Sequence, residues 1–132
     1  MKRILLLAAL IGLIGCQESD RFKSEADLII GEWVYTYPNG CEEITTLNAD
    51  GTWFAESYNE RSQGVYYVEE HKSGRHMFVY RTSGNNGQED CEGDSESGVN
   101  SIDSFYVYFD FITNDQIDFL PEDKPIITMY RR

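Results

Sequence analysis

Basic side chains are scarce in this chain. Only 11 lysines and arginines stand against 23 aspartates and glutamates, which gives a formal net charge of −12 at pH 7. A surface of this sign is a poor partner for nucleic acid and for anionic lipid headgroups. The acidic balance favours solubility, with an acidic functional face as the alternative. No nucleic-acid partner is therefore expected.

Recognisable catalytic motifs are also missing. The chain has no G-x-S-x-G, no H-E-x-x-H and no glycine-rich phosphate loop. These absences remove the commonest sequence signatures of hydrolases, zinc proteases and nucleotide-binding enzymes. The many carboxylates include no pair that spacing singles out as an acid and a base. We therefore expect a protein that is not an enzyme and needs no cofactor.

Only one long apolar run is present, and it lies at the start of the chain. Residues 4–14 are eleven residues interrupted only by Gly12, and Lys2 and Arg3 precede them. A cationic start followed by such a run is typical of a secretory signal peptide, and it is shorter than the roughly 20 apolar residues of a transmembrane helix. We predict that residues 1–15 are a signal peptide and that no transmembrane helix follows.

The end of this run, Leu13-Ile14-Gly15-Cys16, resembles the lipobox of bacterial lipoproteins. The resemblance implies cleavage before Cys16, acylation of its thiol and new amine, and a lipid anchor in the bacterial cell envelope. Gln17 after the cysteine, rather than aspartate, implies the outer membrane, with the protein facing the periplasm. The polar residues 16–24 predict a tether, and residues 25–132 are expected to form one domain.

Cysteine is rare, with three in the whole chain. With Cys16 assigned to the lipid, Cys41 and Cys91 remain as an even pair in an exported protein. Disulfides persist in such compartments, so we predict a bond between these two residues. Two free thiols or two soft metal ligands are the alternatives.

Aromatic residues are plentiful, with nine tyrosines, seven phenylalanines and two tryptophans, and they favour β-structure. Ser24 and two following acids predict a short helical turn. After Gly31 the apolar residues alternate with a period of two between turn signals such as Asp50-Gly51. We predict an all-β, antiparallel up-and-down barrel of about eight strands, with an open sheet or a sandwich as alternatives. The predicted strands are residues 32–37, 41–48, 51–58, 65–70, 75–82, 102–112, 116–120 and 126–131.

Two short motifs add a resemblance. Gly31-Glu32-Trp33 after an apolar helical turn, and Asp50-Gly51-Thr52 in a hairpin, are similar to the opening of bacterial lipocalin-like lipoproteins. In the wider lipocalin family the G-x-W tryptophan seals the closed end of the barrel, and a basic residue from late in the chain packs over it. The resemblance implies these roles for Trp33 and Arg131. The T-D-Y motif of transport lipocalins is absent.

The barrel interior is the main candidate for a binding site. If the G-x-W face points inward, rings that carry hydroxyl groups line the interior and suit a small hydrophobic or amphipathic ligand. The candidate binding residues are Trp33, Tyr35, Tyr37 and Trp53. A barrel filled by its own side chains is the alternative. In that case the protein is a protein-interaction module, such as a lipid-tethered inhibitor that presents an acidic loop to a cationic enzyme.

Metal binding is weakly indicated at two places. Five acids crowd a long Gly- and Ser-rich loop over residues 83–101 and are compatible with calcium, but their order does not match an EF-hand, and a solvated loop is favoured. His71 and His76 bracket a turn but have no third ligand fixed by spacing. We therefore expect no metal site. The loop acids are Glu89, Asp90, Glu92, Asp94 and Glu96.

Overall fold

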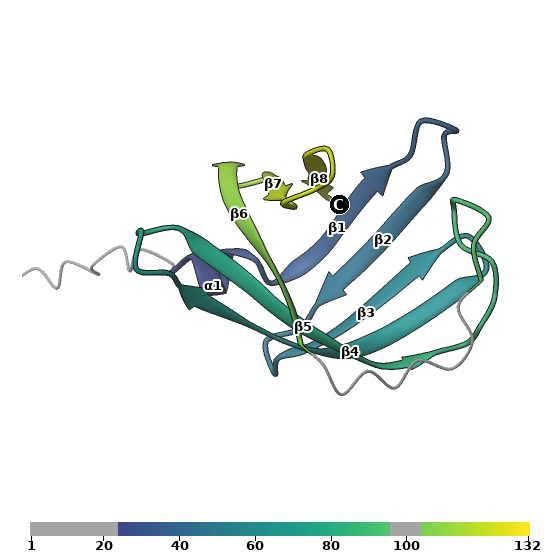
Figure 1. Cartoon of the computed structure of the whole chain (residues 1–132), viewed down its shortest axis with the longest axis horizontal. Coiled ribbons are helices and arrows are strands. Elements are labelled where there is room, and N and C mark those ends of the chain that lie inside the picture. Colours follow the sequence, from purple (N-terminus) through teal and green to yellow (C-terminus); the bar gives the residue numbers. More distant parts are fainter. Residues whose placement is uncertain (1–23, 96–103) are drawn as a thin grey trace, which may run out of the picture.

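The computed structural model describes residues 24–95 and 104–132 (Figure 1). They form an all-β fold preceded by one helical turn, α1 (Glu25–Leu28). The hydroxyl of Ser24 accepts a hydrogen bond from the backbone N–H of Asp27 at 3.2 Å, which satisfies a donor that the start of a helix leaves unpaired. In this described part of the chain, no helix is both long and apolar enough to cross a membrane.

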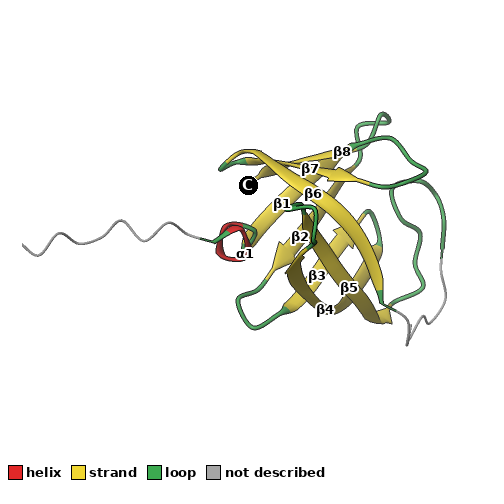
Figure 2. Ribbon diagram, turned by 60° about the vertical axis from the view of Figure 1, so that its left-hand side comes forward, coloured by secondary structure: helices red, strands yellow, loops and turns green. Residues whose placement is uncertain are grey.

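Eight antiparallel strands follow and close into a barrel (Figure 1, Figure 2). They are β1 (Gly31–Thr36), β2 (Glu42–Leu47), β3 (Thr52–Ser57), β4 (Glu60–Glu70), β5 (His76–Asn85), β6 (Phe105–Thr113), β7 (Gln116–Leu120) and β8 (Ile127–Arg131). Each strand pairs with the next along the chain, and β8 closes the barrel on β1, where Arg131 lies opposite Trp33. The predicted up-and-down barrel is confirmed, and the open sheet and the sandwich are wrong.

The fourth strand is longer than the sequence predicts. A turn is expected over residues 59–64, but β4 begins at Glu60 and follows a tight turn in which Tyr58 has a φ of 54°. Ser62 and Gly64 are typical turn residues, yet both are buried and β4 continues through them with a bulge beside Gly64. The expected turn is therefore wrong, because Ser62 and Gly64 are small residues buried inside the barrel within β4 and not residues of a turn.

The long acidic segment also begins later than expected. The sequence places its first residue at Ser83, whereas β5 continues to Asn85. The predicted start of the sixth strand, Ile102, lies outside the described residues, and β6 begins at Phe105 within them. The inward face of β6 follows the predicted alternation, because Phe109 is fully buried and Val107 and Phe111 are partly buried against the core.

The core lies at the end of the barrel beside α1. There the side chains of β1, β6 and β7 meet the residue that follows the helical turn. Rings pack at tilted and edge-to-face angles, for example Trp33 against Phe111 with centroids 6.1 Å apart. The fully buried apolar side chains are Ile29, Trp33, Phe109 and Ile117. Packed side chains close this end of the barrel. They do not fill the interior beyond it.

The predicted disulfide is confirmed between Cys41 and Cys91. It joins the residue before β2 to the acidic loop that follows β5. The amide N–H of Cys91 donates to the Ser57 hydroxyl at 3.2 Å, and its carbonyl accepts from the side-chain amide of Asn39 at 2.8 Å. The bond and these contacts hold the described part of the loop against β2 and β3.

Candidate functional site

The barrel holds an interior cavity of about 1020 Å³ that is open to solvent. Its lining includes Pro38, Glu92 and the β7–β8 loop (residues 121–126), and we call this end of the barrel the mouth. The β7–β8 loop lies at the end of the barrel opposite α1 (Figure 2). All four predicted binding residues line the cavity, and they are Trp33, Tyr35, Tyr37 and Trp53. The predicted inward orientation of the first strand is thus confirmed.

Trp33 forms the floor of the interior cavity. Its indole Nε1 donates to the backbone carbonyl of Ile29 at 2.7 Å, so its polar atom is satisfied although the side chain is 1% exposed. The Arg131 guanidinium lies 4.3 Å from the centroid of the indole ring. Arg131 also donates to the carbonyls of Ile30 at 2.9 Å and Leu28 at 2.6 Å. The predicted packing of Arg131 over Trp33 is confirmed, and it ties β8 to the start of the barrel.

Gly31 makes room for this arrangement. It has a φ of +135°, and a Cβ built on it would lie 2.7 Å from the Arg131 Nη1. Any larger residue would be strained and would displace the guanidinium. The close approach of Arg131 therefore explains why the first residue of the G-x-W motif is glycine.

Apolar side chains line the deep part of the cavity. Phe78 packs edge-to-face on Phe119, with centroids 5.7 Å apart, and Leu47 and Met129 are buried beside them. These residues come from β5, β7, β2 and β8, so several strands contribute to the apolar surface. It offers a ligand an apolar surface away from water.

Trp53 lies in the cavity wall over Gly64 of β4, which has no side chain to displace the indole. Its indole Nε1 donates to the carbonyl of Arg81 on β5 at 3.3 Å, across the intervening strand. The residue of β4 beneath it is Gly64, where a Cβ would lie 2.6 Å from that nitrogen and 1.9 Å from the Arg81 oxygen. Trp53 also meets Tyr80 edge-to-face at 6.3 Å between centroids. A side chain at position 64 would push the indole out of the wall.

The cavity wall carries the carboxyl group of Glu43, which is not among the site residues predicted from the sequence. Glu43 lies on the inward face of β2 and accepts a hydrogen bond from the Tyr37 hydroxyl at 3.0 Å. Burial raises the pKa of Glu43, the nearby charges of Glu60 and Asp90 add to the rise, and hydrogen bonding by the Tyr37 and Ser57 hydroxyls opposes it.

The Glu43 carboxyl also affects the pKa values of two neighbouring tyrosine hydroxyls. Burial first and the charge of Glu43 second raise the pKa values of the Tyr37 and Tyr80 hydroxyls. The alternation of Glu43, Thr45 and Leu47 on β2 is the sequence signal that places this carboxyl inside.

Acids dominate the charged residues around the cavity. Among the described residues that line it, Lys124 is the only base. The loop acid Asp90 is not a free ligand, because its carboxylate accepts from the amides of Glu92 and Asp94, each at 2.9 Å. The acids that line the cavity are Glu43, Glu60, Glu92, Glu122 and Asp123.

The two candidate metal sites are not assembled in the described residues. Within 24–95 and 104–132, no three histidine, cysteine, aspartate or glutamate side chains come together. His71 instead bonds the Ser73 hydroxyl at 2.9 Å, and His76 pairs with Glu25 of α1. The two histidines therefore do not form the suggested pair, and Glu96 lies outside the described residues.

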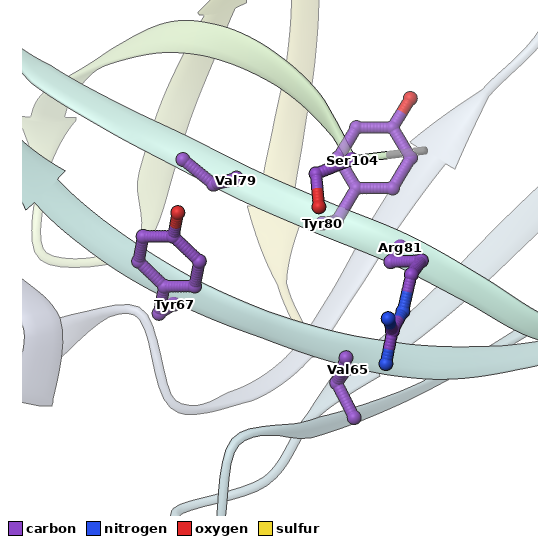
Figure 3. A pocket seen from close by; sticks show the side chains of 6 residues that line it. All are labelled: Val65, Tyr67, Val79, Tyr80, Arg81 and Ser104. Carbon is purple, nitrogen blue, oxygen red and sulfur yellow. The ribbon is translucent and has the colours of Figure 1, made fainter. Parts of the chain in front are cut away.

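A second, smaller hollow lies on the outer face of β4 and β5. Figure 3 shows Val65 and Tyr67 on β4 beside Val79 and Arg81 on β5. Its volume is about 220 Å³, and Tyr67 is 57% exposed. This volume is well below that of the interior cavity, which we take as the candidate site.

No known protein family, curated protein or solved structure matches this chain. The structure itself defines the class: a closed, eight-stranded antiparallel barrel with an interior cavity.

Proposed function

We propose that this protein binds a small hydrophobic or amphipathic molecule inside its barrel and is held in the bacterial cell envelope by a lipid on Cys16. The observation that carries the binding proposal is the interior cavity of about 1020 Å³, with its apolar depth and aromatic walls. Ligand sites in proteins are about 300–1,000 Å³, mostly apolar, with a few placed polar groups. The similarity of the G-x-W and D-G-T segments to lipocalin-like lipoproteins supports the same proposal.

Binding is favoured over catalysis and over inhibition of another protein. Neither histidine is among the residues that line the cavity, so the commonest general base is missing from its wall. The inhibitor hypothesis requires a barrel filled by its own side chains, and this interior has room for a ligand. An acidic mouth remains compatible with a cationic partner.

Binding is tested with the neutral fluorescent probe N-phenyl-1-naphthylamine on protein in nanodiscs, with protein-free nanodiscs subtracted. We expect saturable fluorescence enhancement, and we expect Ala55→Trp to abolish it because the indole would occupy the cavity that Ala55 lines. The matched control is Phe54→Trp on the same strand, where the side chain is 36% exposed outside the cavity lining. Equal binding by the two variants, both folded by circular dichroism, contradicts an interior site.

The anchor is tested by metabolic labelling with an alkyne analogue of palmitate. We expect the wild-type protein to be labelled and to sediment with membranes. Cys16→Ser should lose the label and be released or left uncleaved, because several acyl chains hold a protein on a bilayer and none would remain. Equal labelling of the wild type and the variant contradicts acylation at Cys16.

A further inference from the structure

We infer that the interior cavity selects an amphipathic amine, with the ammonium group bound at Glu43 and the apolar part in the deep end of the barrel. This inference rests on the proposed binding function and names the chemical class of the ligand.

The position of Glu43 carries the inference. Along β2 it lies directly opposite Tyr35 of β1 on one side and Ser57 of β3 on the other. A carboxylate has about four acceptor positions, and the Tyr37 hydroxyl uses one of them at 3.0 Å. Capacity therefore remains for donors from a ligand, and an ammonium group offers three.

The partly buried Glu43 carboxylate has no basic side chain paired with it in the described wall of the cavity. No arginine is among the described residues that line the cavity, and Lys124 belongs to the loop at the mouth. Burying a charge without a counter-charge is costly, and a cation from outside would offset that cost. Glu43 is thus a charge that the folded chain leaves for a ligand to neutralise.

The aromatic walls favour the same class of ligand. Tyr35, Tyr37, Trp53 and Tyr80 all line the cavity, and Tyr35 meets Tyr37 edge-to-face with centroids 4.7 Å apart. The faces of such rings attract cations, most strongly where water is excluded. Rings and carboxylate together form a wall suited to an ammonium group.

The charge at the mouth disfavours the opposite class. A fatty acid or another carboxylate would have to pass Glu92, Glu122 and Asp123 and then lie near Glu43. Clefts lined by charge of one sign concentrate ligands of the opposite sign. The cavity should therefore discriminate by ligand charge as well as by size.

The preference should depend on pH. The titratable groups that act on Glu43 are the hydroxyls of Tyr37 and Tyr80, whose raised pKa values keep them neutral near pH 7, and the carboxyl groups of Glu60 and Asp90. Because the pKa of Glu43 is raised, the carboxylate becomes neutral at a higher pH than an ordinary glutamate. Affinity for a cation should fall as the pH is lowered through that value.

Three probes of one shape test the inference by displacement of N-phenyl-1-naphthylamine from protein in zwitterionic nanodiscs. They are 2-(1-naphthyl)ethylamine, the neutral 2-(1-naphthyl)ethanol and the anionic 3-(1-naphthyl)propanoate. At pH 7 we expect the amine to bind about tenfold more tightly than the alcohol, because hydrogen bonds to ionised groups are roughly twice as strong as neutral ones. The propanoate should bind more weakly than the alcohol.

Two matched variants separate Glu43 from general electrostatics. Glu43→Gln keeps an acceptor for the Tyr37 hydroxyl and should bind the amine and the alcohol equally. Glu42→Gln removes the same charge from the exposed neighbouring position and should keep the tenfold preference. Equal loss in both variants overturns the inference.

The wild-type protein decides the matter without the variants. Equal affinity for amine and alcohol overturns the amine inference and leaves the proposed binding function standing. If neither N-phenyl-1-naphthylamine nor any of the three probes binds, both fall.

Discussion

Replacing Trp33 with alanine is expected to lower the free energy of unfolding by about 3–5 kcal/mol, which threatens a domain whose whole stability is about 5–15 kcal/mol. The indole is 1% exposed, donates to the Ile29 carbonyl and lies beneath the Arg131 guanidinium. Truncation would therefore remove apolar contact, leave the carbonyl without its donor and take away the ring on which the arginine packs. Urea denaturation followed by circular dichroism measures the loss.

Val34→Ala is the matched control on the same strand. Val34 is only partly buried and is not among the residues that line the cavity, so its truncation should cost about 1 kcal/mol or less. A nearly unchanged midpoint for Trp33→Ala with a large loss for Val34→Ala would reverse the orientation of β1. It would also remove the tyrosines of β1 from the cavity.

Removing the disulfide is expected to lower the free energy of unfolding by a similar amount. The bond closes a loop with a sequence separation of 50 residues, and the chain-entropy relation assigns such a loop about 4 kcal/mol of stability. The double variant Cys41→Ala/Cys91→Ala should unfold at a clearly lower urea concentration than the oxidised wild type. Reduced wild type should match the variant.

Mass spectrometry supplies the independent check on this bond. The intact mass of the exported protein should rise by two hydrogens on reduction. Thiols at Cys41 and Cys91 that alkylate without a reductant, or a double variant as stable as the oxidised protein, would contradict the prediction.

The closed end of the barrel could be predicted from the sequence because its signals are local and repetitive. Alternation groups Trp33 with Tyr35 and Tyr37 on one face, and the resemblance of the G-x-W motif implies that this face points inward. With Cys16 assigned to the proposed lipid, Cys41 and Cys91 are the pair that remains. Each of these inferences needs only a few residues.

The choice between an open cavity and a filled barrel could not be made from the sequence, because it depends on side-chain volumes summed across strands. Strands β2 to β4 bring small buried or half-buried residues to the interior, and this leaves space that larger side chains would fill. In the sequence two of them look like turn residues, which is why the start of β4 is predicted wrongly. The role of Glu43 is equally hidden, because alternation groups it with Thr45 and Leu47 but only the closed register shows which side chains of β1 and β3 lie beside it. The small residues are Thr45, Ala55, Ser57, Ser62 and Gly64.

The helical turn α1 lies beside the closed end of the barrel, and the β7–β8 loop lies at the opposite end (Figure 2). If a lipid on Cys16 anchors the protein as proposed, the anchored segment joins the barrel at its closed end and the mouth is the end farther from that attachment. A ligand would then arrive through the aqueous space rather than slide in from the anchoring membrane. The protein would act as a fixed trap for molecules that diffuse past it.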